Sequence, residues 1–415
     1  MHDARARARD TAEAVARRSY GKLVAFLASP MRDVAGAEDA LSEAFAAALE
    51  HWPVRGIPDN PEAWLITAAR RRKIDAARKR RRSEDAVDHL KLLADELAGD
   101  SESVLPDRRL DLMFACAHPA IDADIRAPLI LQTVLGFDAS AIASAFLIAP
   151  ATMSQRLVRA KTKIRAAAIP FRVPARDELR ERLDGVLDAI YAAYAEGWSD
   201  PSGTDIHRRN LATEAIWLGR LVASLLPGEP EALGLLSLML HTDARRAARR
   251  DSQGEFIPLT AQDTALWDHD LIMEAEQLLR QAQPMNAIGR YQLEAAVQSA
   301  HAVRRRFGHA DWAAIVLLYD ALIALTGSPV VAINRAVALA EMEGAPAGLA
   351  ALDRLVGDPR LAQYQPWWAA RADLFARAGN ITEAHAAYEN AIGLESDGAV
   401  RLFLRKKQLL CQPKK

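Results

Sequence analysis

The chain has 415 residues, of which 50% are hydrophobic and 26% charged, and its formal net charge is −1. This balance excludes a disordered chain, and the length predicts two or three domains of about 150 residues each. The two distant cysteines, Cys116 and Cys411, form no CxxC motif and indicate neither a disulfide framework nor a four-cysteine zinc site. No signal peptide is recognisable, and no apolar run approaches the about 20 residues of a membrane span, so we expect a cytoplasmic protein without a membrane partner.

The small net charge hides an uneven distribution. Residues 1–170 contain 26 Lys and Arg against 23 Asp and Glu, whereas the remainder contains 27 against 31. The front part is therefore mildly basic and the rear part mildly acidic.

Two helices are predicted at the start of the chain. The first covers residues 10–28, and the second covers residues 35–52, where the sequence reads AGAEDALSEAFAAALEHW. Apolar residues recur at helical spacing in both. In the second helix they are Ala40, Leu41, Ala44, Phe45, Ala48 and Leu49, while Asp39, Glu43 and Glu50 lie off this stripe. Trp52 and Pro53 are expected to end the helix.

A third helix is predicted over residues 60–82, NPEAWLITAARRRKIDAARKRRR. Asn60 suits the cap position and Pro61 the first helical position. Trp64, Leu65, Ala68 and Ala69 share one face, and Thr67, Arg70, Arg71 and Arg78 lie on another. Residues 70–82 contain nine Lys or Arg and a single acid, Asp75, a density suited to phosphate neutralisation. A solvated basic helix end is the alternative interpretation.

An acidic linker over residues 83–105 precedes a second small helical unit that begins at Pro106. Near its end, Asp138 is expected to cap a short helix, and Pro150 to start a longer one, in a helix-turn-helix arrangement. The outer side of the second helix would carry Thr152, Ser154, Gln155, Arg156, Arg159, Lys161 and Lys163. Arg and Gln can read base edges, whereas Lys, Ser and Thr suit phosphates.

The rear half has only helical patterns, and its last part repeats. The stretch SPVVAINRAVALAEMEG with APAGLAALDRLV is similar to PWWAARADLFARAG with NITEAHAAYENAIGLE, and Gly344 and Gly379 lie at equivalent positions. Helix pairs repeated at about 34 residues are typical of tetratricopeptide arrays, which bind partners on a concave surface.

Reaction machinery is not recognisable in the sequence, which contains no HExxH, P-loop, GxGxxG or GxSxG motif. Cys116 and His118 fit core packing better than a metal site. Asp243, Asp251 and Asp263, with Arg245, Arg246, Arg249 and Arg250 between them, fit a small-anion site or ion-paired helix ends equally well. We therefore predict a protein that is not an enzyme and has no cofactor.

The order of these stretches resembles bacterial sigma factors of the extracytoplasmic-function group over residues 10–168. The whole chain resembles the subgroup with a C-terminal tetratricopeptide-like extension, through SGTDIHRRNLATEAIWLGRL, DARRAAR at Asp243 and INRAVALAE. The resemblance implies an all-α protein with four parts: sigma region 2 at residues 1–82, the linker at 83–105, a region 4 helix-turn-helix at 106–170, and a helical extension at 171–415.

The resemblance also implies partners and sites. Asp39, Glu43 and Phe45 would contact core RNA polymerase. The loop at residues 54–60 with Thr67, Arg70, Arg71 and Arg78 would capture the −10 element of promoter DNA, and residues 152–163 would read the −35 element. The extension would regulate activity by binding a protein or a small molecule. In the helix-turn-helix, Leu147 stands where relatives usually have a turn glycine.

Two further hypotheses remain open at this stage. One is a ligand-sensing helix-turn-helix regulator that does not bind core polymerase, and the other is a scaffold whose basic segments are solvated faces. The front helices favour the sigma factor, because a repressor needs neither the AEDALSEAF surface nor a cationic helix for single strands.

Overall fold

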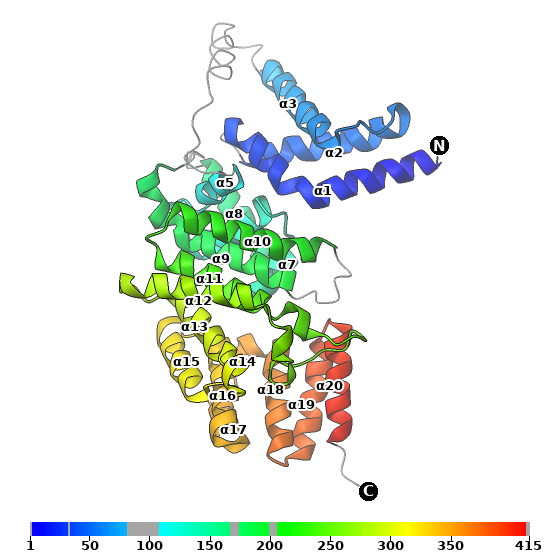
Figure 1. The fold of residues 1–415 in the computed structure, drawn as a ribbon. Helices are drawn as coiled ribbons and strands as arrows, with labels where there is room; N and C mark the ends of the chain where they lie inside the picture. The colour runs from blue at the N-terminus through cyan, green and yellow to red at the C-terminus, as the bar shows by residue number, and fades with distance from the viewer. Residues whose placement is uncertain (1, 32–33, 81–107, 167–173, 199–205, 412–415) are drawn as a thin grey trace. The chain divides into compact units, whose positions relative to one another are not determined.

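The computed structural model describes residues 2–31, 34–80, 108–166, 174–198 and 206–411 (Figure 1). Apart from one isolated β-bridge between Arg250 and Phe256, these residues form helices, turns and loops. The predicted all-α class is therefore confirmed. The chain divides into two compact units, Met1–Ala193 and Tyr194–Lys415, called unit 1 and unit 2 below. The predicted acidic linker at 83–105 lies outside the described residues.

Unit 1 begins with three long helices, α1 (His2–Met31), α2 (Val34–Arg55) and α3 (Pro61–Arg80), which pack against one another. Their apolar stripes form the core, in which Val24, Leu41 and Leu65 are fully buried. Two details differ from prediction. Leu49 is 48% exposed although Ala48 and Trp52 are buried, so Leu49 lies off the buried stripe of α2 to which the sequence pattern assigns it. Pro53 lies inside α2, because a proline in the last turn removes only one hydrogen bond near the helix end.

The second part of unit 1 contains α5 (Arg108–Cys116), α6 (Ala123–Thr133), α7 (Ala139–Ala145) and α8 (Pro150–Ala166). Helix α1 packs on α5, and Gly21 of α1 lies so close to the Val134 carbonyl that no side chain fits there. The helix α9 (Leu179–Trp198) begins in this unit, where the buried Arg182 donates to the Phe114 carbonyl at 3.3 Å. The two parts of unit 1 are therefore in direct contact.

Unit 2 continues with α10 (Ile206–Leu225), α11 (Pro230–Asp243), α12 (His269–Ala282), α13 (Arg290–Ala302) and α14 (Arg304–Phe307). Helix α11 is buried along almost its whole length and packs against α10, α12 and α13. A short 3-10 helix, η3 (Arg246–Arg249), follows α11 directly. Two more, η4 (Leu259–Ala261) and η5 (Thr264–Leu266), precede α12.

The end of unit 2 is a series of antiparallel helices. They are α15 (Trp312–Thr326), α16 (Pro329–Glu343), α17 (Ala345–Asp353), α18 (Gln365–Arg377), α19 (Ile381–Leu394) and α20 (Gly398–Leu410), and each packs on the next. Gly344 and Gly379 link α16 to α17 and α18 to α19 with φ of 93° and 84°, a left-handed region that favours glycine. The predicted helix pairs at these two places are therefore present.

The segment before α12 also contacts the last helix of the chain. Arg250 pairs with Asp397 at 2.6 Å, Lys406 with Glu255 at 2.6 Å, and the rings of Phe256 and Phe403 meet edge to face at 5.4 Å. Figure 1 shows this green segment beside the red α20. Residues about 150 positions apart in the sequence are thus in direct contact within unit 2.

A search for membrane-spanning helices finds no single candidate among the described residues. The helices α7 and α8 satisfy the criteria of length and apolarity only when taken as a pair, and this pair is bent by 109°.

Candidate nucleic-acid interface

Helix α3 has the capped start and the buried face that its sequence predicts. The Asn60 carboxamide oxygen accepts a hydrogen bond from the Ala63 amide at 3.0 Å, and Pro61 is the first helical residue. Leu65 and Ala69 are fully buried, and the Trp64 ring packs edge-on against Trp52 with centroids 5.6 Å apart. This packing fixes which side of α3 faces solvent.

The solvent side of α3 carries Thr67 and Arg70, both exposed. The Thr67 hydroxyl donates to the Ala63 carbonyl at 2.8 Å, and the Arg70 guanidinium lies 5.0 Å from the centre of the Phe26 ring. A cation held on an aromatic face keeps its charge while losing little mobility on binding a phosphate. Arg71 and Arg78 belong to the same helix, but their side chains lie outside those described.

Helices α7 and α8 form a bent pair with the geometry of a helix-turn-helix unit. The angle between them is 109°, within the about 90–120° usual for such units. Asp138 caps α7, because its carboxylate accepts hydrogen bonds from the amides of Ser140 and Ala141. The hydrogen bond from the Ser140 hydroxyl is the main cause that lowers the pKa of the Asp138 carboxyl group, and the two amides contribute further. Leu147 occupies the turn with φ of 53°. Ile142 and Ala143 of α7, with Met153 and Leu157 of α8, are buried.

Helix α8 carries the side chains predicted to meet duplex DNA. Thr152, Ser154, Gln155, Arg159 and Lys163 are exposed, whereas Arg156 and Lys161 are half-buried. The seven predicted side chains therefore do not share one exposed face of α8, because Lys161 points toward Glu38 of α2 and Arg156 toward Asp124 of α6. Arg159 makes no ion pair within the described part of the chain, so its guanidinium is available to a ligand.

Three of the α8 cations are engaged by carboxylates that the sequence did not single out. Arg156 pairs with Asp124 at 3.1 Å, and Lys163 with Asp122 at 2.9 Å, both near the start of α6. Lys161 pairs with Glu38 of α2 at 2.8 Å, and this pair is the most shielded of the three. These acids lie 32 to 123 positions away, so helical periodicity gives no signal for the pairs.

Helix α2 divides its acidic residues between two sides. Asp39 and Glu43, one turn apart, are exposed, and Phe45 is half-buried. Glu38 faces the second part of unit 1 through its bond to Lys161. The predicted polymerase contact is therefore an outward surface with two carboxylates and a partly accessible aromatic ring.

The other candidates from the sequence have structural partners. Cys116 is fully buried, and burial first, then the Glu38 charge, raises the pKa of its thiol. His118 accepts a hydrogen bond from the Ala120 amide at 3.1 Å. Asp243 pairs with Arg246 at 2.5 Å, and Asp251 and Asp263 accept from backbone amides in their own turns. In the described regions no three potential metal ligands cluster.

Comparison with known proteins matches two parts of the chain to family models. Residues 15–83, which include most of α1 and all of α2 and α3, match Sigma-70 region 2. Residues 182–283 match a family of unknown function, DUF6596. The uncharacterized protein R00370 of Rhizobium meliloti (strain 1021) is 39% identical over 378 residues, which are 89% of this chain and 88% of that protein. No solved structure matches the chain.

Proposed function

We propose that the chain is a promoter-specific sigma factor of the extracytoplasmic-function group, because its residues 15–83 match Sigma-70 region 2. The observation that carries the proposal is the coincidence of the region 2 match with α2 and α3. Their exposed residues include the acids Asp39 and Glu43 and the DNA-facing candidates Thr67 and Arg70. The family works by binding core RNA polymerase, which supplies the catalysis.

Each surface has a distinct physical task in this proposal. Asp39, Glu43 and Phe45 contact core polymerase. The loop at residues 54–60 and the α3 face with Thr67, Arg70, Arg71 and Arg78 hold the −10 element as its strands separate, because cationic grooves offset part of the cost of unstacking bases. Helix α8 enters the major groove at the −35 element, where Arg and Gln read base edges and Lys, Ser and Thr bind phosphates. The acidic linker at residues 83–105 joins the two DNA-binding parts.

The residues from 171 to 415 form a regulatory tetratricopeptide-like extension in this proposal. Two observations support it. The α16–α17 and α18–α19 pairs each turn at a glycine with positive φ, Gly344 and Gly379. In the second pair the buried residues Ala372, Ala384, Tyr388 and Ala391 pack together. Arrays of such pairs act by offering a surface to a ligand or protein.

Run-off transcription with purified core polymerase tests the main proposal. The intact chain should co-purify with core polymerase and start transcription from its own promoters. The double variant Arg156→Ala, Arg159→Ala should still bind polymerase but lose initiation by at least about tenfold, since each base contact contributes about 1–3 kcal/mol. Arg360→Ala, which removes an exposed arginine paired with Asp358, is the matched control and should initiate normally.

The same experiment separates this function from its alternative. A chain that binds promoter DNA but shows no affinity for core polymerase would be a ligand-sensing regulator, and the sigma-factor proposal would be wrong. The regulatory role is tested by a chain truncated after residue 198, which retains α9. Transcription that is equal with and without the extension, under all conditions, would contradict that role.

A further inference from the structure

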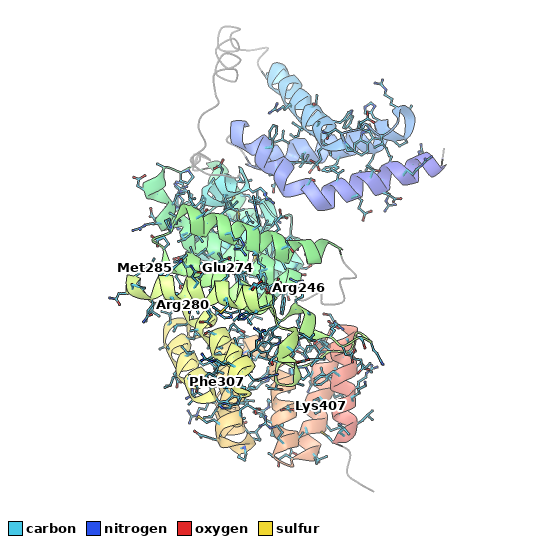
Figure 2. The ribbon with its side chains drawn as sticks, viewed as in Figure 1. Arg246, Glu274, Arg280, Met285, Phe307 and Lys407 are labelled. Carbon is cyan, nitrogen blue, oxygen red and sulfur yellow. The ribbon has the colours of Figure 1, made fainter. Side chains whose placement is uncertain are left out.

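Three arginines of unit 2, Arg245, Arg249 and Arg304, lie around one small core cluster. Ala244 and Ala248, next to the first two, pack with Trp267, and the Arg304 guanidinium lies 5.4 Å from the centre of the Trp267 ring. Arg245 lies at the junction of α11 and η3, Arg249 ends η3, and Arg304 begins α14. Figure 2 labels Arg246 in the same short segment. All three side chains are half-buried, so each retains some access to solvent. We call these residues the arginine cluster.

The arginine cluster is held by neutral groups. Arg245 donates to the Gln298 side-chain oxygen at 2.6 Å. Arg249 donates to the Trp198 carbonyl at 2.7 Å and stacks on the Trp198 ring at 4.2 Å. Arg304 donates to the carbonyls of Leu259 and Gln262. These contacts orient three guanidinium groups without neutralising any of them.

The immediate neighbours of the cluster are neutralised. Arg246 pairs with Asp243 at 2.5 Å, and Arg250 with Asp397 at 2.6 Å. By contrast, none of the three cluster arginines has a carboxylate within ion-pair distance in the regions that the structure describes. Half-buried cations without a counter-charge are unfavourable, because water no longer compensates for their charge fully.

Burial and neighbouring positive charges both act on the guanidinium groups of the cluster. Burial is the main cause that lowers the pKa of Arg245 to about 10, and the charge of Arg304 adds to it. The pKa of Arg249 is lowered to about 10, mainly by burial and then by the charge of Arg250. The charges of Arg245 and Arg246 contribute further. Both values remain well above neutral pH, so these guanidinium groups keep their charge.

Two histidines next to the cluster stay neutral. Burial, followed by the charge of Arg245, lowers the pKa of His241 to about 3, and burial with Arg245 and Arg304 lowers that of His301 to about 4. His241 is 2% exposed, and neither ring nitrogen has a hydrogen-bond partner among the described residues. Glu276 Oε1 lies 3.4 Å from Nε2, outside hydrogen-bond geometry. The Gln262 side-chain oxygen is likewise buried without a partner.

We propose that the arginine cluster binds a small oxyanion with two or more negative charges, such as a phosphate compound or a polycarboxylate. The planar guanidinium fork matches the oxygen geometry of phosphate and carboxylate groups, and its donors not used by neutral groups can turn to the anion. A monovalent anion would leave most of the cluster charge uncompensated. His241 and Gln262 supply further polar atoms beside the site.

Binding at the arginine cluster does not depend on the transcriptional role of the chain. Its use as a signal rests on the proposed function, in which the extension regulates a sigma factor. Arg245 and Arg249 lie in the part of the chain that matches DUF6596, and Arg304 lies beyond it. The Rhizobium protein, which is similar over most of the chain, offers a second protein for the same measurement.

Calorimetric titration of the intact chain with inorganic phosphate, pyrophosphate and citrate at constant ionic strength tests the proposal. Saturable binding of one anion per chain is expected, and the ranking of the three probes separates a phosphate ligand from a polycarboxylate. Arg245→Gln should weaken binding at least about tenfold. Arg360→Gln makes the same change of charge at a distant ion pair and should bind like the wild type.

Thermal unfolding provides a second measurement that does not need the Arg245 variant to fold. A bound anion raises the unfolding temperature of the wild type by mass action and in proportion to site occupancy, whereas a general salt effect is also produced by sodium chloride at the same ionic strength. No saturable binding of any probe to the wild-type chain would overturn the proposal. The proposal would also be overturned if single-stranded DNA displaced the anion and bound with the same affinity as the anion. The cluster would then be a nucleic-acid contact.

Discussion

Leu147, in the turn between α7 and α8, has a strained backbone conformation. Its φ of 53° places a side chain in the left-handed region, at a cost of about 1–2 kcal/mol that glycine avoids. The side chain is 37% exposed, so its removal loses only part of a buried surface. We therefore expect Leu147→Gly to raise the free energy of unfolding by up to about 1 kcal/mol after the entropy cost of glycine.

Urea denaturation followed by circular dichroism measures this effect. Leu147→Ala is the control, because alanine keeps the Cβ that causes the strain and loses the same packing. An alanine variant as stable as the glycine variant would show that the backbone at this turn is not strained.

Replacing Gly21 and Gly393 by alanine should change the free energy of unfolding in opposite directions. At Gly21 a Cβ would run into the Val134 backbone, so α1 and the end of α6 must move apart, and the free energy of unfolding should fall by about 2 kcal/mol or more. At Gly393, in α19, a Cβ meets nothing within 4 Å. Alanine there should stabilise the chain by about 0.5–1 kcal/mol through helix propensity. Equal effects in thermal unfolding would contradict the close packing at Gly21.

At the scale of the helix, α8 is both a predicted DNA reader and a member of three ion pairs. Glu38 of α2 competes with DNA phosphate for Lys161, at an N–O distance of 2.8 Å. Glu38→Gln should therefore strengthen duplex binding and steepen its salt dependence by about one unit of log–log slope. Glu50→Gln, an exposed change of equal charge on the same helix, is the control.

Fluorescence anisotropy between about 50 and 200 mM salt measures both variants. If Glu38→Gln and Glu50→Gln changed the slope equally, only the net charge of α2 would matter, and the Lys161 pair would have no role in DNA binding.

Local signals account for the elements that the sequence predicts well. Asn60 with Pro61, and Asp138, mark helix starts by side-chain chemistry within three residues, and the stripes of α3 and α8 follow helical spacing. Contacts between distant segments have no such signal. The Lys161–Glu38 pair, the exposure of Leu49 and the convergence of Arg245 with Arg304 depend on how whole helices pack, which a periodic pattern does not specify.

At the scale of the whole molecule, unit 2 should be sensitive to acid. The pKa values of His241 and His301 lie below the ordinary value of 6.5, so the unfolded chain takes up these protons first. Stability should therefore fall as the pH drops from about 6.5 toward 4, by at most about 1.4 kcal/mol per pH unit for each histidine. Glu276 beside His241 would offset part of this loss.

Scanning calorimetry across this pH range measures the effect. His241→Gln should flatten the pH dependence of the unfolding temperature, whereas His385→Gln, an exposed change in α19, should leave it unaltered. An unchanged profile in the His241 variant would mean that folding does not lower the pKa of this imidazole.

Helix α20 contacts the segment that precedes α12, and this contact affects the order in which the helices of unit 2 unfold. In a linear array each repeat is stabilised by its neighbours alone, so terminal repeats fray first and melting proceeds in steps. Here Asp397 and Lys406, close to the last helix's two ends, are tied to Arg250 and Glu255. Because two ion pairs tie α20 to residues 250–255, we expect α20 to separate from α19 only after both pairs have broken.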